Sequence, residues 1–191
     1  MVGKATRTAW FKNSNRPQAL ANLTRWMGNT AFAREVSWRI VDIKRAPDEW
    51  HDAPVLLATG SKPPAFGADD LDKLRTYVDQ GGTIFSVTEG GGDDFEKGMR
   101  ATYAKLFPEQ ELNEAPLTHD LYRMQEDLTR SSVRFHIISK GDRLLAIHVA
   151  KDLLRPWQTN QATGEKPAFG AALNVYLYVT DQARAQNPAI K

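Results

Sequence analysis

The fold of this chain is decided by the segments Pro54-Val-Leu-Leu-Ala-Thr-Gly-Ser61 and Gly81-Gly-Thr-Ile-Phe-Ser-Val-Thr-Glu-Gly-Gly-Gly92. Each segment holds a short apolar run that ends in a turn of small residues, and an amphipathic helical segment, residues 69–80, joins them. This order predicts a parallel β-α-β unit whose two strand ends open onto the same edge of a sheet. Because ligands bind outside the carboxyl ends of such strands, we expect function at residues 59–61 and 88–92.

Alternating strands and helices continue on both sides of this unit. Strands are predicted over 6–11, 36–43, 55–58 and 83–87, and helices after Pro17, from Asp69 and from Asp93 to Leu106. Residues 134–138 and 143–149 predict a hairpin with Gly141 at its turn, and residues 168–179 predict a final helix. Residues 109–130 indicate an irregular excursion and residues 151–167 a long loop. The pattern favours an α/β fold, a three-layer α-β-α sandwich with a mostly parallel sheet, flavodoxin-like or amidotransferase-like.

Composition is that of an ordinary soluble, folded domain. The 191 residues are 41% apolar and 25% charged, and they suit one α/β domain over 1–181 followed by a polar tail over 182–191. A net charge of +2 without a dense Lys/Arg block argues against nucleic-acid binding. No apolar run approaches the roughly 20 residues that span a bilayer, so we expect no membrane insertion by this segment.

The chain contains no cysteine, which excludes disulfides, cysteine-type zinc sites and thiol nucleophiles. We predict neither a cofactor nor a metal. The first residues lack the apolar stretch of a signal peptide. The sequence as given therefore indicates a cytoplasmic protein, or a periplasmic one where a native leader has been removed. A small molecule and a protein both stay open as partners, and an oligomer is possible.

Several motifs follow one another over residues 6–180. Besides the first segment quoted above, they are the Leu71–Gly82 helix end, Leu106-Phe-Pro-Glu-Gln-Glu-Leu112, Pro116-Leu-Thr-His-Asp-Leu-Tyr122, Ala150-Lys-Asp-Leu153 with Trp157, and Phe169-Gly-Ala-Ala-Leu-Asn-Val-Tyr-Leu-Tyr178. In this order they resemble the bacterial family known as domain of unknown function 4159. That family is similar to the class I glutamine amidotransferase-like superfamily, and the resemblance implies a parallel sandwich with a sharp turn after the strand that begins at Thr83.

The resemblance also bears on activity. In amidotransferases the sharp turn carries a cysteine, and a His-x-Glu motif follows a later strand. Here the turn reads Val87-Thr-Glu-Gly90, and the later strand ends in Ile147-His-Val-Ala-Lys-Asp152 without that motif. Glutamine hydrolysis is therefore not expected. Because the cysteine and a complete triad are missing, we expect a pseudoenzyme that serves as a non-catalytic ligand-binding or assembly module. The resemblance implies that it is part of a bacterial, envelope-associated system.

Glu89 is the first candidate for a catalytic or ligand-binding residue, because it follows an apolar strand and precedes three glycines. A carboxylate there could act as a general base or bind a cation, and Gly90 and Gly91 would let a ligand approach the backbone. The alternative is a solvated turn residue. The turn lacks the lysine and Ser/Thr of a P-loop, and its aspartates would repel phosphate. The other residues expected to bind a ligand at this edge are Thr59, Gly60, Ser61 and Thr88.

A hydrolase with substituted machinery is the alternative function. Glu89 or Thr88 would stand at the turn, with His148 as base and Asp152 orienting it, and backbone N–H groups of Gly60 or Gly90 would stabilise an oxyanion. The competing interpretation is a packed strand histidine, hydrogen-bonded locally, with Asp152 capping the residues that follow it.

Trp157 and a His-Asp-Glu set suggest two further sites. Trp157, in the expected long loop, could stack on a sugar or an aromatic ligand, or it could pin that loop to the body of the domain. A metal site could draw on His119, Asp120 and Glu89. Their spacing fits no zinc or calcium motif, so no metal ligands are assigned.

Overall fold

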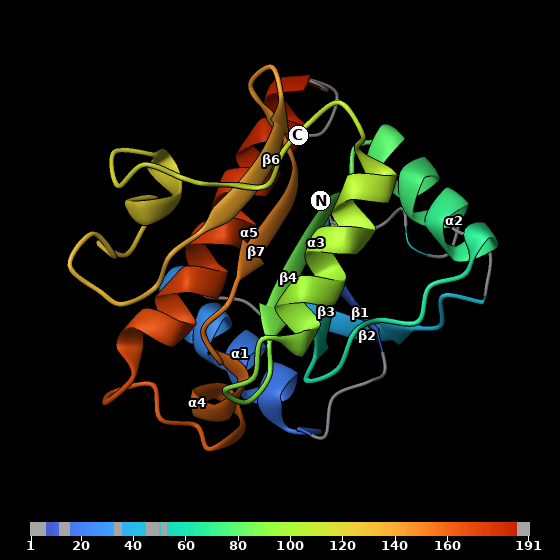
Figure 1. Ribbon diagram of the computed structural model, residues 1–191. Coiled ribbons are helices and arrows are strands. Elements are labelled where there is room, and N and C mark those ends of the chain that lie inside the picture. Colours follow the sequence, from blue (N-terminus) through green and yellow to red (C-terminus); the bar gives the residue numbers. More distant parts are fainter. Residues whose placement is uncertain (1–6, 12–15, 33–35, 45–49, 51–52, 187–191) are drawn as a thin grey trace.

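A seven-stranded sheet forms the centre of the computed structural model, which describes residues 7–11, 16–32, 36–44, 50 and 53–186. Within these residues the strand order is β2-β1-β3-β4-β7-β6-β5 (Figure 1). The parallel strands are β1 (Arg7–Phe11), β2 (Ser37–Val41), β3 (Val55–Gly60), β4 (Thr83–Thr88) and β7 (Arg143–Val149). Antiparallel strands β6 (His136–Lys140) and β5 (Asn113–Glu114) complete one edge. The predicted, mostly parallel sheet is confirmed.

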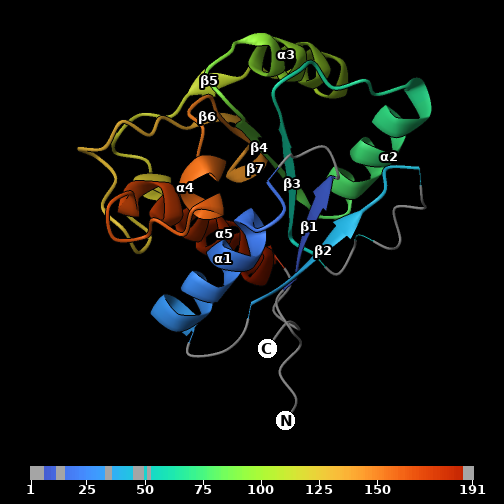
Figure 2. The same cartoon turned by 90° about the horizontal axis from the view of Figure 1, so that it is seen from below.

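Helices cover both faces of the sheet (Figure 2). The α1 (Ala19–Met27), α4 (Leu154–Gln158) and α5 (Lys166–Gln186) helices lie on one face, and α2 (Ala68–Asp79) and α3 (Asp94–Leu106) on the other. This is the predicted flavodoxin-like α-β-α sandwich, with the strand order reversing between β1 and β3. In the part of the chain that the structure describes, no helix is both long and apolar enough to cross a membrane.

The two central strands, β3 and β4, are buried at every position because helices cover both faces. Successive side chains enter different cores, as the period of a strand requires. Phe85 and Val87 pack in the core beneath α1 and α5. Ile84 packs with Tyr77 and Met99 beneath α2 and α3. The carboxyl ends of β3 and β4 are therefore the first points where polar groups of this unit can meet solvent or a ligand.

The elements differ from the sequence prediction in several places, and one is the short strand β5 inside the expected irregular excursion. The expected loop over 151–167 contains α4, which is too short to show a helical period. The final helix begins at Lys166, two residues before the predicted start, and continues to Gln186. A π-helical turn over Gly28–Phe32 follows α1, where the sequence predicts a stop. Residue 6 of the first predicted strand, and residues 13–15 proposed to cap the first helix, lie outside the described residues.

Asn174 on α5 holds the irregular excursion against the body of the domain. Its amide is 0% exposed. Its Oδ1 accepts from the N–H groups of Gln125 and Glu126, each at 3.0 Å. Its Nδ2 donates to the carbonyls of Leu121 at 2.9 Å and Glu126 at 2.8 Å. One side chain thus satisfies four main-chain groups of a segment whose regular structure is limited to β5 and a short 3-10 turn, Asp120–Tyr122.

Replacing Asn174 with leucine should therefore destabilise the protein strongly. Leucine keeps a similar volume but leaves buried N–H and carbonyl groups without partners, at a cost of about 2–4 kcal/mol in the free energy of unfolding. Urea denaturation measures the loss in the free energy of unfolding. Amide hydrogen exchange in the variant should increase most, relative to the wild type, over residues 121–128. The exposed Asn113→Leu serves as control. A loss no larger than that of the control would show that Asn174 does not anchor the excursion.

Candidate functional site

The carboxyl ends of β3, β4 and β7 lie side by side at one edge of the sheet. Gly60 pairs with Thr88, and Val87 pairs with Val149, so the three strands end at about the same level. We refer to this edge, with residues 59–61, 88–92 and Asp152, as the strand-end site. The topology thus brings together the two turns that the sequence marks as candidates.

The turn after β3 is packed tightly against its neighbours. The Glu89 N–H donates to the carbonyl of Gly60 at 2.8 Å, which ties the two turns together. A Cβ on Gly60 would lie 2.9 Å from Phe95 of α3, so this position has no room for a side chain. Thr59 is buried, whereas Ser61 is exposed beyond the strand. Of this predicted trio, Ser61 is therefore the residue whose side chain is open to solvent.

Glu89 is buried, although it stands in a turn. It is 6% exposed, and its Oε1 has no hydrogen-bond partner among the residues that the structure describes. The following Gly90 has a φ of 76°, in the region that favours glycine, and this makes the turn sharp. The interpretation of Glu89 as a solvated turn residue is wrong, because the turn folds its carboxylate inward. Thr88 Oγ1 is likewise buried without a partner in the described part of the chain.

Asp152 joins three segments at this edge. Its Oδ2 accepts from the Gly90 N–H at 2.9 Å and from Nη2 of Arg16, just before α1, at 2.6 Å. Its Oδ1 accepts from the N–H groups of Leu154 and Arg155 at 3.0 Å each and so caps α4. The capping role proposed for Asp152 is confirmed, and the contact with Gly90 places it beside the β4 turn.

His148 lies below the edge, inside the sheet. It pairs with Ser86 across β4 and β7, and its Nδ1 lies 2.7 Å from Ser86 Oγ. The Tyr103 hydroxyl donates to the same Ser86 oxygen at 2.7 Å. The imidazole is 0% exposed, and its Nε2 is buried with no partner within the described residues. Burial lowers the pKa of His148 to about 4. The structure thus places Asp152 beside the turn that carries Glu89, while His148 makes its hydrogen bond to Ser86 inside the sheet.

Sequence reasoning missed Arg16, Ser86 and Tyr103. Arg16 follows β1, whose carboxyl end lies at the same edge of the parallel sheet, so the strand order alone could have pointed to it. Ser86 shares a strand face with Thr88 and could have been grouped with a histidine on the next strand. Tyr103 carried no signal, because only the packing of α3 brings its hydroxyl to Ser86.

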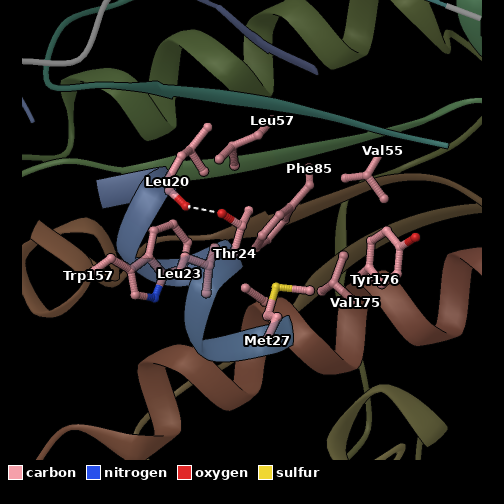
Figure 3. A pocket seen from close by; sticks show the side chains of 11 residues that line it. Leu20, Leu23, Thr24, Met27, Val55, Leu57, Phe85, Trp157, Val175 and Tyr176 are labelled. Carbon is pink, nitrogen blue, oxygen red and sulfur yellow. Dashed lines mark hydrogen bonds between the residues drawn. The ribbon is translucent and has the colours of Figure 1, made fainter. Parts of the chain in front are cut away.

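Trp157 lies in α4 and not in a loop, and its side chain is 0% exposed. Its Nε1 donates to the carbonyl of Ala168 at 3.0 Å. The indole borders a cavity of about 30 Å³ whose other walls are mainly apolar residues of α1, α5 and the sheet (Figure 3). So small an apolar cavity suits no polar ligand. The expectation that Trp157 stacks on a ligand is corrected, because the burial of its ring supports the pinning role.

The hypothetical metal ligands lie in different surroundings. His119 begins the 3-10 turn, its Nδ1 accepts from the Leu121 N–H at 3.2 Å, and its ring lies 5.3 Å from that of Tyr178. Among the residues that the structure describes, no group of three or more His, Asp or Glu side chains is arranged to hold a metal ion. His119 and Asp120 thus belong to the excursion packed on α5.

Comparison with known proteins agrees with this architecture. The family model of the domain of unknown function DUF4159 matches residues 5–180. No curated protein matches the chain. Among solved structures, the chain is similar to a candidate GMP synthase protein from Thermoplasma acidophilum (TM-score 0.52, 7% identity, covering 96% of this chain and 98% of that one). It is also similar to a candidate ThuA-like protein from Bacteroides uniformis (TM-score 0.50, 8% identity, covering 98% and 96%). These likenesses concern the fold alone.

The buried imidazole should make the protein sensitive to acid. The native pKa of His148 is about 4, against an ordinary value of 6.5, so between these values the unfolded chain binds a proton that the native protein refuses. The contribution of His148 to the free energy of unfolding is therefore fully present above pH 6.5. It is lost as the pH falls toward 4, by on the order of 3 kcal/mol. Denaturant titration from pH 7 to 4 measures it.

His148→Asn can keep a hydrogen bond to Ser86 without titrating, and should remove that part of the pH dependence. His136→Asn is the matched control, because His136 lies opposite on β6, is less buried and also has a pKa lowered by burial. Glu96 and Arg100 of α3 act on both imidazoles. An unchanged pH profile in His148→Asn would contradict the assignment.

Proposed function

The chain belongs to the DUF4159 family, and we propose that it is a non-catalytic module that binds a small ligand at the strand-end site. We place the family in the class I glutamine amidotransferase-like superfamily as part of the same proposal. We further propose that the module works in a bacterial, envelope-associated system. The sharp turn after β4 supports the kinship, and the lack of a cysteine in the chain supports the non-catalytic role. Fold likeness alone does not transfer an activity, so the proposal depends on the site.

The observation that carries the proposal is the buried carboxylate of Glu89. An oxygen that is out of contact with solvent and has no hydrogen-bond partner costs roughly 1–3 kcal/mol, more when it is charged. The buried amide of Asn174, by contrast, is fully hydrogen-bonded. Glu89 Oε1 has no partner among the residues that the structure describes, and it lies at the edge where α/β proteins bind ligands. A group supplied by a ligand is the partner that we propose for it.

The chemistry of Glu89 restricts the ligand. A carboxylate accepts hydrogen bonds and attracts positive charge, so we expect its partner to be a cationic N–H donor, an ammonium or a guanidinium. The exposed glycines at 91 and 92 leave open space around the turn, since a Cβ at either position would meet nothing within 4 Å. The ligand group would reach Glu89 past this turn.

Hydrolysis has less support from the same geometry. A general base must lie within hydrogen-bond reach of the nucleophile, and a third group must orient it. His148 makes its hydrogen bond to Ser86 inside the sheet. Asp152 uses both oxygens on backbone amides and Arg16. Binding is thus the function that the arrangement favours.

Glu89→Gln should raise the stability of the free protein and abolish binding. The neutral amide removes the cost of a buried charge, so the free energy of unfolding should rise by about 1 kcal/mol, as when function is traded against stability. Differential scanning fluorimetry with paired probes, primary amines and guanidines against their N-acetyl counterparts, measures binding as a rise in Tm.

At least one cationic probe should raise the Tm of the wild type and leave Glu89→Gln unmoved. The control is Glu111→Gln, which removes an exposed carboxylate and should respond like the wild type. If Glu89→Gln is destabilised and still responds to the same probes, the carboxylate is a structural group and the site must be sought elsewhere.

A further inference from the structure

We infer that Arg16 and the backbone N–H of Gly90 form a binding corner for a ligand carboxylate, and that Asp152 occupies this corner in the ligand-free protein. The inference goes beyond the proposed role of Glu89, since it assigns a second site of opposite charge at the same edge. It does not depend on which donor meets Glu89.

The two donors converge on a single oxygen. Arg16 Nη2 is 2.6 Å and the Gly90 nitrogen 2.9 Å from Asp152 Oδ2. A guanidinium and a backbone amide that meet at one carboxylate oxygen make a charge-assisted anion site. The three groups come from distant parts of the chain, with 136 and 62 residues separating Asp152 from Arg16 and from Gly90. Tertiary structure, and not local turn geometry, therefore builds this corner.

The two oxygens of Asp152 do different work. Oδ1 alone caps α4, through the N–H groups of Leu154 and Arg155. A serine or asparagine side chain can supply such a cap with one oxygen. Among the described residues, Oδ2 accepts from Arg16 and Gly90 and takes no part in the cap. The carboxylate in contact with Arg16 and Gly90 can thus be replaced by another one without loss of the helix cap.

The corner is also within reach of solvent. The side chains of Arg16 and Asp152 keep 20% and 16% of their exposure, and Gly90 is exposed. The present occupant is a carboxylate, so a ligand carboxylate reproduces its charge and planar shape. Such a ligand must compete with Asp152, which is permanently tethered beside the donors and so lowers the apparent affinity.

Removing Oδ2 should therefore uncover the corner. Asp152→Ser keeps a capping oxygen but is too short to reach Gly90, and Asp152→Asn is a second variant that can cap through its amide oxygen. Acetate is the probe, and NMR titration of the Gly90 amide signal is the measurement. We expect half-saturation at an acetate concentration at least ten-fold lower in either variant than in the wild type, with folding confirmed by circular dichroism.

Arg16→Gln in the Asp152→Ser background should abolish this gain. Asp127→Asn is the matched control, because Asp127 also accepts from a nearby backbone N–H, that of Thr129, but is bound to no arginine in the described structure. Equal affinity in wild type and both variants, or a gain that survives loss of Arg16, would overturn the inference. Tighter binding of inorganic phosphate than of acetate would overturn the carboxylate assignment. Neither result bears on the Glu89 probes, so the two proposals fail separately.

Discussion

The double burial of β3 and β4 is the constraint on which the rest of this structure depends. Helices on both faces leave no solvated side, so from Thr83 to Val87 the side chains of β4 are apolar or hydrogen-bonded within the domain. Thr83 illustrates the second case, because its hydroxyl donates to the carbonyl of Leu144 at 2.9 Å. Polar chemistry is consequently displaced to the strand ends, where Gly60 and Glu89 lie next to each other.

Buried polar groups in this domain fall into two kinds: those whose hydrogen bonds are complete or nearly so, and those that keep an atom without a partner among the described residues. Asn174 and the Tyr103–Ser86 pair make complete or nearly complete sets of hydrogen bonds and hold distant segments together. Glu89 is buried to a similar degree but leaves an oxygen unpartnered within the described part of the chain. Groups of the first kind are stable inside the domain because their hydrogen bonds offset the cost of burying them. Packing alone does not account for a buried carboxylate oxygen without a partner among the described residues. The proposed ligand group would account for it.

Much of the fold could be predicted from the sequence, because apolar runs of strand length and helical periods report burial directly. The segments around Leu56 and Phe85 are examples. The composition of the site could be predicted only in part. Glu89 was found because it follows a strand, whereas the partners of His148 depend on the register with Ser86, which no single segment contains. Arg16 meets Asp152 across 136 residues, and α4 is stabilised by a cap and a buried tryptophan more than by its own period.

The sharp turn after β4 can bind an anion without also carrying a nucleophile. Its shape comes from the positive φ of Gly90 and from the hydrogen bond between Glu89 and Gly60, and neither needs a nucleophile. An N–H group at such a turn favours an anion whether or not a covalent bond follows. In this chain the Gly90 amide already holds a carboxylate, that of Asp152. The anion-binding property of the turn is therefore present in a chain without cysteine, and this fits the proposed role of the edge in ligand recognition.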